Sequence, residues 1–202
     1  MGIKEENEIT VRITGNIKEV CKIIEDKGFK ITEESTYTDI FMIPDYIINK
    51  MSDMESREIL KHAIIIRNLE NKTNNTTNKR ITFKEKQIND KGEITSQKAT
   101  NCNINDIDEA INLFEAIKYR KIMEITERDT IYEKNGLGVA IKDVENGENL
   151  IEIETVSSDN RLDTIEKLKE EIIKLEIPID TSDFFIKKAE IELDKILVKK
   201  TS

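Results

Sequence analysis

The sequence predicts an α+β fold: a closed, eight-stranded antiparallel β-barrel with flanking helices. Three observations favour this class. Aliphatic and polar residues alternate in about eight segments, as they do along strands that present two different faces. Short turns such as "KNGLG" and "ENGE" join successive segments, which indicates antiparallel neighbours. Runs with helical spacing lie near both ends, and eight strands are enough to close a barrel that has no free edge.

The first strand and helix have the clearest local signals. Residues 7–14 place Ile9, Val11 and Ile13 on one side of a strand. Asn16 then has the character of a helix N-cap, and apolar residues recur at helical spacing until Gly28 ends the run. We therefore expect a strand followed by an amphipathic helix.

The middle of the chain is predicted to consist of strands, turns and short helical stretches. Residues 29–43 have the pattern of a strand, a turn or bend, and a second strand. Short helical stretches follow Pro44 and span "SDMESREILKH", and the polar segment 71–80 is predicted as a loop. The further strands expected here are 63–70, 81–88 and 94–104.

The last part of the chain combines a helix, three strands and two closing helices. Asn105 or Asp106 is the expected cap of a helix that reaches Ile117. Strands follow near 121–133, 138–144 and 149–156. One closing helix carries Leu162 to Ile172, and the other follows Asp183. We expect a single domain over residues 1–202, with helices over 158–200 packed on the barrel.

Composition and charge exclude several functions. The chain has 202 residues, with 32 Lys plus Arg against 41 Asp plus Glu and a net charge of −9. This balance argues against a nucleic-acid surface, but a locally basic cavity for a small anion stays compatible with it. No apolar run is long enough to cross a bilayer, so we expect a cytoplasmic protein without a membrane partner. The single histidine, His62, and the cysteines Cys21 and Cys102 form no recognisable nucleophile or metal motif.

Full charges occupy the non-aliphatic side of several predicted strands. In a barrel covered by helices this side faces the lumen, which would then be a hydrated, charged tunnel. Carboxylates there are suited to Mg²⁺ or Mn²⁺, and arginine or lysine to phosphate. A sheet with one solvated face, or an interior of self-paired ion pairs such as Glu8 with Arg67, would give the same pattern. The residues concerned are Glu8, Arg12, Arg67, Lys84, Glu152 and Glu154.

An ordered series of motifs runs through nearly the whole chain. It comprises Glu8-Ile9-Thr10-Val11-Arg12, Gly28-Phe29, Asp39-Ile40-Phe41-Met42, Ile64-Ile65-Ile66-Arg67, Ile81-Thr82-Phe83-Lys84, Tyr132 and Glu152-Ile153-Glu154. The series resembles the CYTH superfamily of triphosphate tunnel metalloenzymes, which includes class IV adenylate cyclases, thiamine triphosphatases and inorganic triphosphatases. In that family the corresponding patterns are E-x-E-x-K, Gly-Phe, D-T-Y-F, L-R-I-R, L-T-x-K, a strand that ends in Tyr, and E-I-E.

The sequence departs from the family pattern at several charged positions. Thr10 replaces the second opening glutamate, and Ile65 replaces the first arginine of L-R-I-R. The R-x-E-x-E strand falls on uncharged residues, and two basic positions of the K-x-R-x-x-Y strand have become acidic. Arg128 and Lys142 lie nearby and would compensate if the register were shifted by one residue. The positions of the two altered strands are Gln97, Ala99 and Asn101, and Glu127 and Asp129.

The resemblance implies a divalent-metal-dependent phosphohydrolase that acts on inorganic triphosphate, thiamine triphosphate or a nucleotide inside the barrel. It implies that Glu8, Glu152 and Glu154 ligate Mg²⁺ or Mn²⁺, and that Glu8 or Glu154 orients the attacking water. The implied phosphate-binding residues are Arg12, Arg67 and Lys84.

Two alternatives to hydrolysis stay open at this stage. One is a tunnel that binds a polyphosphate or nucleotide without turnover. The other is a reaction like that of the class IV adenylate cyclases, in which the ribose 3′-hydroxyl attacks the α-phosphate. The expected partner is in each case a small anionic triphosphate or nucleotide, and a homodimer is left open.

Overall fold

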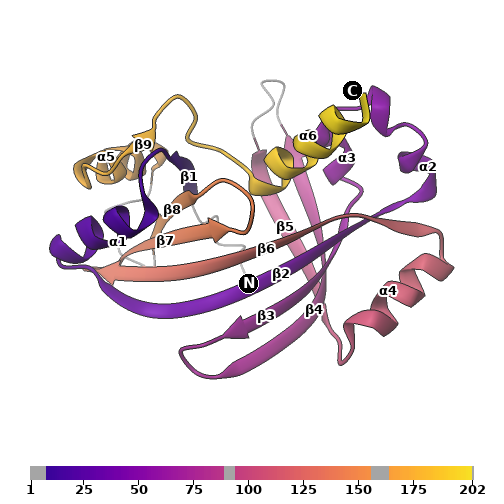
Figure 1. Cartoon of the computed structure of the whole chain (residues 1–202), viewed down its shortest axis with the longest axis horizontal. Coiled ribbons are helices and arrows are strands. Elements are labelled where there is room, and N and C mark those ends of the chain that lie inside the picture. The colour runs from indigo at the N-terminus through magenta and orange to yellow at the C-terminus, as the bar shows by residue number, and fades with distance from the viewer. Residues whose placement is uncertain (1–7, 89–93, 156–163, 202) are drawn as a thin grey trace. The chain divides into compact units, whose positions relative to one another are not determined.

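A computed structural model describes residues 8–88, 94–155 and 164–201 of the chain. The described strands form one sheet of nine strands, in the order β5-β4-β3-β2-β6-β7-β8-β1-β9 (Figure 1). The strands are β1 (Glu8–Ile13), β2 (Lys30–Pro44), β3 (Ile64–Asn71), β4 (Thr76–Ile88), β5 (Ile94–Asn103), β6 (Tyr119–Lys134), β7 (Leu137–Val144), β8 (Leu150–Thr155) and β9 (Ile179–Asp180).

Helices occupy the connections and the C-terminal part of the chain. They are α1 (Ile17–Asp26), α2 (Asp45–Ile48), α3 (Ser56–Leu60), α4 (Ile107–Ala116), α5 (Ile165–Lys174) and α6 (Lys188–Thr201), with a 3₁₀ turn η1 (Met51–Asp53). None of the helices in the described ranges combines the length and the apolar character that a membrane span requires.

The chain divides into two compact units, which are described separately below. Unit 1 contains Met1–Thr36, Asn71–Asn75 and Glu127–Lys188. Unit 2 contains Tyr37–Glu70, Thr76–Thr126 and Ala189–Ser202.

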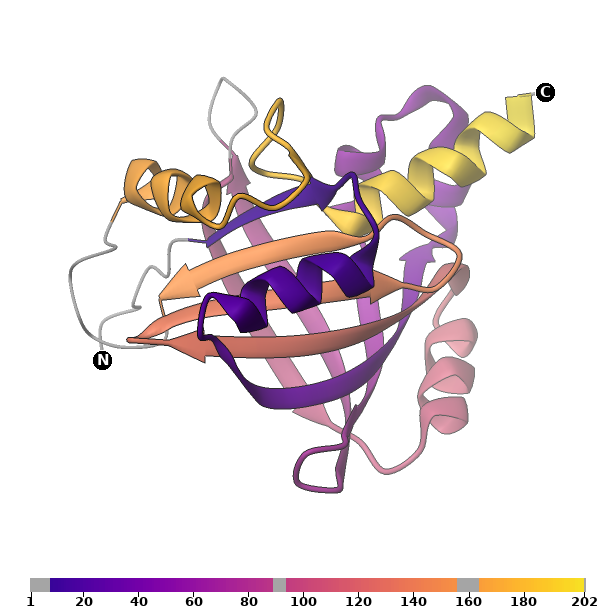
Figure 2. The ribbon, with the colours of Figure 1, turned by 60° about the vertical axis from the view of Figure 1, so that its left-hand side comes forward.

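Unit 1 is built on strands that gather most of their aliphatic side chains on one face. Antiparallel pairing sets Ile9 of β1 opposite Ile153 of β8, and Ile153 opposite Val139 of β7. Helices α1 and α5 cover this face with Val20, Ile24, Leu168 and Ile172, all fully buried. Figure 2 shows α1 lying across strands β7 and β8. Burial of this apolar face is the main favourable term for the unit.

Local signals fix the ends of α1 as the sequence predicts. The side chain of Asn16 accepts a hydrogen bond from the Lys18 backbone N–H at 2.9 Å, so it is the N-cap. Gly28 follows the helix with φ +87°, a conformation that favours glycine.

The free edge of β1 is covered by the segment that follows α5. Strand β9 pairs with Arg12 and Ile13 of β1. Farther along, the Thr10 N–H donates to the Phe184 carbonyl at 3.0 Å, and the Ile186 N–H donates to the Thr10 carbonyl at 3.2 Å. These bonds satisfy backbone groups that an edge strand would otherwise leave open. Residues 179–186 therefore take the place beside β1.

Unit 2 has its own smaller core under α4. Ile40 and Met42 of β2, Ile66 of β3 and Ala110 of α4 are buried together, and Phe114 packs against them. Asp106 caps α4 by accepting a hydrogen bond from the Glu109 N–H at 2.9 Å, as predicted.

Helix α6 is tied to α3 within unit 2. Arg57 pairs with Glu190 at 2.9 Å, and the Ser56 hydroxyl donates to Asp194. These polar contacts join the last helix to a short helix that lies more than a hundred residues earlier in the chain.

The structure confirms the α+β class, the antiparallel sheet and the flanking helices, but differs from the prediction in sheet closure. The sheet has nine strands rather than eight, and its order runs from β5 to β9 without closing among the described residues. The physical reason lies at β1, because its second edge is occupied by β9 and residues 184–186 instead of by another long strand.

Three element boundaries also differ from the sequence-based expectation. Strand β2 is continuous where a bend was expected. The loop expected over residues 71–80 is shorter, because β4 begins at Thr76 and the turn before it uses Asn75 at φ 54°. The last helix begins at Lys188, since residues 184–186 pair with β1 instead. The expected position of Leu162 lies outside the described residues.

The buried face of β8 leads to a stability prediction. Ile153 is fully buried, whereas Ile173 on α5 is 56% exposed. We expect Ile153→Ala to lower the free energy of unfolding by about 2–5 kcal/mol, because it leaves a cavity in the core. The matched variant Ile173→Ala should change it by no more than about 0.5 kcal/mol. Urea unfolding followed by circular dichroism measures both, and equal losses would contradict the assigned core.

Candidate functional site

The face of β6, β7, β8 and β1 opposite the aliphatic core carries a group of charged residues from several strands. The register sets Glu8 opposite Glu154, Thr10 opposite Glu152, and Asp129 opposite Lys142. Because side chains alternate along a strand, these residues share one side. We call this side the polar strand face, and define it by Glu8, Thr10, Arg12, Glu127, Asp129, Lys142 and Glu152.

The predicted glutamates of β1 and β8 are thereby brought to one face. Glu8 and Glu152 lie on neighbouring strands, and the backbone of Glu154 is directly opposite Glu8. The side chain of Glu154 lies outside the described residues, so its predicted roles as metal ligand and catalytic group stay predictions.

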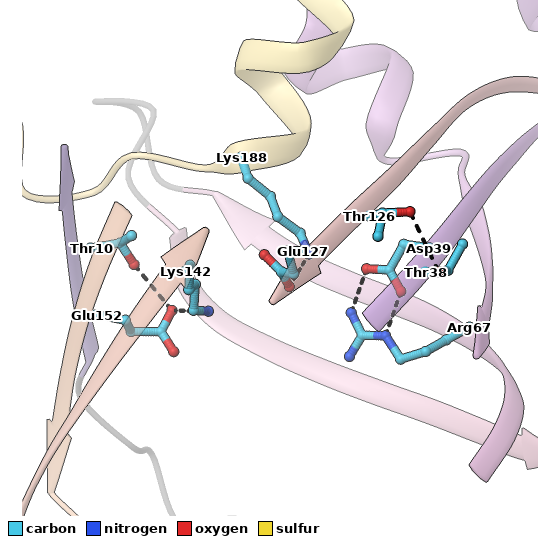
Figure 3. Close-up of polar contacts among 9 residues, drawn as sticks. All are labelled: Thr10, Thr38, Asp39, Arg67, Thr126, Glu127, Lys142, Glu152 and Lys188. Carbon is cyan, nitrogen blue, oxygen red and sulfur yellow. Dashed lines mark hydrogen bonds and ion pairs between the residues drawn. The ribbon is translucent and has the colours of Figure 1, made fainter. Parts of the chain in front are cut away.

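Glu152 sits in a buried ion pair. Its Oε2 accepts a hydrogen bond from Lys142 Nζ at 2.8 Å and another from the Thr10 hydroxyl at 3.2 Å (Figure 3). Burial alone would raise the pKa of Glu152, but the Lys142 ammonium and these hydrogen bonds lower it below its ordinary value. The pKa of Lys142 is raised, because Glu152, Asp129 and Glu127 more than offset the effect of its burial.

Glu8 has a lysine partner from the C-terminal segment. Lys187 Nζ lies 3.0 Å from Glu8 Oε1, and the Glu8 side chain is 44% exposed. This ion pair is more open to water than the Lys142–Glu152 pair.

Glu127 pairs with the next residue of the same segment. Lys188 Nζ donates to Glu127 Oε1, and both side chains are largely buried (Figure 3). The second oxygen of Glu127, Oε2, is buried and has no hydrogen-bond partner among the described residues. Lys187 and Lys188 therefore bring two positive charges to the polar strand face.

Asp129 is a buried carboxyl group of this face whose pKa is raised. Its pKa is raised from 3.8 to about 7, first because it is buried and second because Glu127 lies nearby. Lys142 and Lys188 act in the opposite direction, and Glu152 adds to the rise. Oδ1 of Asp129 is buried without a hydrogen-bond partner in the described part of the chain.

Arg12, a predicted phosphate-binding residue, is engaged near the end of β1. Its guanidinium pairs with Glu148 and lies 3.4 Å from Asp180. The hydrogen bond to Glu148 raises the pKa of Arg12 above its ordinary value, against a small opposing effect of burial.

The register decides which basic residue accompanies the acidic positions of β6. Arg128 points to the other side of β6 and pairs at 2.9 Å with Asp143, which lies opposite it on β7. Lys142 lies opposite Asp129 on the polar strand face. The one-residue shift considered from the sequence therefore does not occur, and of the two basic residues only Lys142 adds charge to this face.

Arg67, in unit 2, forms a bidentate ion pair. Its Nε and Nη2 lie 2.5 and 2.6 Å from the two carboxylate oxygens of Asp39 (Figure 3). The centroid of the Tyr37 ring lies 4.9 Å from the guanidinium carbon. Asp39 is fully buried. Arg67, a predicted phosphate-binding residue, is thus paired with Asp39, the first residue of the Asp39-Ile40-Phe41-Met42 motif.

The neighbouring strands of unit 2 hold the other predicted positions. Lys84 is half-buried on β4, opposite Ala99 of β5. On the same side, the Thr82 hydroxyl donates to Asn101 at 2.8 Å. Asn101, an uncharged residue at one position of the family's R-x-E-x-E pattern, thus pairs with a threonine of the neighbouring strand.

The metal site predicted from the sequence stays a prediction. Glu8 and Glu152 share a face, but each has a lysine at hydrogen-bond distance. Among the described side chains, no three carboxylate, imidazole or thiol groups gather in a way that could hold a metal ion. The predicted set of three would need Glu154 to complete it.

Sequence reasoning missed the lysines that follow the last pair of phenylalanines. Both lysines were expected in the last helix, which is confirmed for Lys188, the first residue of α6, and wrong for Lys187, which precedes the helix. Asp39 was noted only as part of a strand motif. No local sequence pattern predicts the ion pairs of Lys187, Lys188 and Asp39, because the partner of each lies far away in the chain.

Comparisons with known proteins identify the fold. No family model matches the sequence, and no curated protein matches it. The PH1819 protein from Pyrococcus horikoshii OT3 is similar in structure, with a TM-score of 0.67 at 19% identity over 94% of this chain and 99% of that one. An adenylate cyclase candidate from Vibrio parahaemolyticus has a TM-score of 0.56 at 11% identity, covering 96% and 97% of the two chains. The adenylyl cyclase candidate HpAC1 from Hippeastrum, described as having a dominant triphosphatase activity, has a TM-score of 0.50 at 12% identity, covering 88% and 90%.

The chain shares its fold with these structures, which is consistent with the resemblance of its sequence to the CYTH superfamily. The similarity extends over nearly the full length of these chains, so it concerns the whole arrangement and not a shared motif. The low identity and the missing family match show that the sequence has diverged far from these neighbours, so the likeness is one of fold.

The buried pair on β7 and β8 leads to a second prediction. Glu152→Gln would leave the Lys142 ammonium without its closest counter-ion, and we expect a loss of about 3 kcal/mol in the free energy of unfolding. The pair Lys121–Glu124, with an N···O distance of 2.6 Å, is exposed. Glu124→Gln should therefore leave the midpoint of urea unfolding unchanged. Equal effects of the two variants would show that Lys142–Glu152 is no buried ion pair.

Asp129 gives a prediction for the pH dependence of stability. Between about pH 4 and pH 7 the native protein retains a proton on Asp129 that the unfolded chain releases, so the free energy of unfolding falls as the pH rises. In Asp129→Asn this contribution is absent. We expect the stability of the wild type relative to Asp129→Asn to fall by on the order of a few kcal/mol across this window. Parallel stability curves in urea titrations at several pH values would contradict the raised pKa.

Proposed function

We propose that this chain is a divalent-metal-dependent phosphohydrolase that acts on a triphosphate-containing molecule. The observation that carries the proposal is the register of β1 and β8, which sets Glu8 and Glu152 on one face and Glu154 opposite Glu8. Lysines lie beside the first two carboxylates. Carboxylates bind a divalent cation and ammonium groups bind phosphate, so a face that carries both suits a complex of metal and phosphate.

In this proposal Glu8, Glu152 and Glu154 would hold Mg²⁺ or Mn²⁺, which would act as a Lewis acid and offset the negative charge of the phosphate groups. Such a cation would replace Lys187 and Lys142 as the partner of Glu8 and Glu152. Glu8 or Glu154 orients the attacking water.

Arg12, Arg67 and Lys84 are the proposed phosphate-binding groups. Arginine is suited to bidentate contacts with phosphate, and the Arg67–Asp39 pair already has the fork geometry that such contacts use. A tunnel that encloses the substrate stays a prediction of the resemblance.

The fold neighbours support this class of reaction. HpAC1 from Hippeastrum is described as having a dominant triphosphatase activity, and the neighbour from Vibrio parahaemolyticus is described as an adenylate cyclase candidate. Hydrolysis and adenylate cyclisation both begin with attack on a phosphorus atom of a triphosphate chain. The cyclase-like reaction is therefore the alternative that one assay must separate from hydrolysis.

Turnover tests the proposal directly. Purified protein is incubated with inorganic triphosphate, ATP or thiamine triphosphate and Mg²⁺ or Mn²⁺, while phosphate and cyclic AMP are measured. We expect phosphate release with at least one substrate, and a loss of about 100-fold in Glu8→Gln, because a carboxylate that holds the metal is removed. Glu124→Gln, on the exposed pair, should retain full activity. No product above background with any substrate would contradict catalysis.

Binding without turnover is a second candidate, favoured by one specific observation. Thr10 occupies the position of the second opening glutamate and donates to Glu152, which Lys142 also neutralises. In that case inorganic triphosphate should raise the melting temperature while no phosphate is released. If triphosphate with and without metal leaves the melting temperature unchanged, this second candidate is contradicted as well.

A further inference from the structure

We propose that anions bind on the polar strand face at Lys142 and Lys188, and that this binding is coupled to proton uptake by Asp129. The inference rests on the proposed function in one respect, namely that the ligand is a phosphate-chain anion. It adds two binding groups and a proton acceptor that the family resemblance does not supply.

Five charged side chains form the buried cluster on which the proposal stands. Lys142 lies opposite Asp129 and pairs with Glu152, while Lys188 pairs with Glu127. Glu127 is 3% exposed and Asp129 is 8% exposed, and the other three side chains are also largely buried. Three carboxylates against two ammonium groups leave one net negative charge when all are ionised.

Two carboxylate oxygens of this cluster lack donors. Glu127 Oε2 and Asp129 Oδ1 are buried and without a hydrogen-bond partner among the described residues. A buried anionic oxygen without a donor is costly, so a neutral carboxyl group is favoured at this place. A cluster with this defect can hold a proton, accept a donor from a ligand, or do both.

The electrostatics indicate which of the two carboxyl groups takes the proton. Burial raises the pKa of Asp129 to about 7, and Glu127 on its own strand adds to the rise. Lys142 from β7 and Lys188 from the start of α6 lower it, and Glu152 from β8 raises it. Strand β7 separates Asp129 from Glu152. Asp129 is therefore the member of the cluster that changes charge near neutral pH.

Protonation of Asp129 prepares the cluster for an anion. With Asp129 ionised, the cluster has a net charge of −1 and repels a phosphate chain. With Asp129 neutral, the charges of Lys142 and Lys188 are balanced only by Glu127 and Glu152. A phosphate oxygen bound to the two ammonium groups would favour the neutral form of Asp129 still more. Because linkage is reciprocal, binding must take up protons and must weaken as the pH rises.

This arrangement also accounts for the acidic residues at positions 127 and 129 of β6. The resemblance predicts basic residues there, and a phosphate chain would need them. Lys142 and Lys188 supply two ammonium groups from β7 and from the start of α6, and Glu127 and Asp129 become their counter-ions. The competing explanation is a purely structural ion-pair cluster, which would bind no anion and exchange no protons with one.

Isothermal titration calorimetry with inorganic triphosphate tests the proposal on the full chain. The titration contains EDTA and is run at about pH 8 in two buffers with different ionisation enthalpies, which gives the number of protons taken up. We expect uptake of on the order of half a proton or more per anion in the wild type, and clearly less in Asp129→Asn. The comparison removes the proton uptake of the ligand itself, since both proteins bind the same anion.

The binding groups are tested in the same titration. Lys142→Met and Lys188→Met should each weaken binding at least about tenfold, because a buried cation that contacts phosphate is lost. Lys121→Met, on the exposed Lys121–Glu124 pair, is the matched control and should leave the affinity unchanged. If Asp129→Asn does not fold, sulfate replaces triphosphate for the wild type, because sulfate keeps its charge over this range. Its binding should then weaken between about pH 6 and pH 8.

Each outcome supports or overturns the inference. Equal proton uptake by the wild type and Asp129→Asn overturns the coupling, and unchanged affinity in both lysine variants overturns the binding site. Metal-dependent phosphate release together with either result would leave the proposed function standing and remove only this inference. Proton-coupled binding without turnover would support the inference and contradict hydrolysis.

Discussion

The rest of unit 1 depends on one constraint, the burial of an aliphatic face. Strands β1, β7 and β8 form this face, and helices α1 and α5 pack on it. Side chains alternate along a strand, so burial of Ile9, Ile153 and their neighbours on one side sends every second residue to the other. The side on which the charged residues of these strands lie is therefore fixed by the side on which the aliphatic residues are buried. The hydrophobic core thus collects Glu8, Thr10 and Glu152 on one face before any of them forms a polar contact.

Charged groups on this partly buried face are stabilised by ion pairs, and the lysines that form these pairs come from several elements of unit 1. Lys142 is already on the same face, whereas Lys187 and Lys188 arrive because residues 179–186 follow the edge of β1. The positions of Lys187 and Lys188, which pair with Glu8 of β1 and Glu127 of β6, therefore depend on backbone hydrogen bonds at the edge of β1. The result is a face on which carboxylates and ammonium groups lie next to each other in ion pairs.

Much of the fold was predictable because its signals are local. Asn16 and Asp106 cap the helices they were expected to cap, and the alternation of aliphatic residues locates β1, β7 and β8. Predictions failed where local sequence is neutral. Residues 184–186 have a helix-compatible pattern, but they pair with β1 because its edge offers unsatisfied backbone groups. In the candidate site, Glu8 and Glu152 were likewise predicted from the local pattern, whereas the role of Lys188 depends on a distant contact and was not predicted.

The sequence by itself determined the α+β class and the two faces of β1 and β8, with Glu8, Arg12 and Glu152 on the polar side, because strand periodicity and caps act over a few residues. Tertiary structure alone decided that the sheet order does not close among the described strands, that Lys142 rather than Arg128 faces Asp129, and that Asp39 pairs with Arg67. These outcomes depend on strand register and on contacts between distant segments. Their energies come from burial and charge pairing that no short stretch of sequence contains.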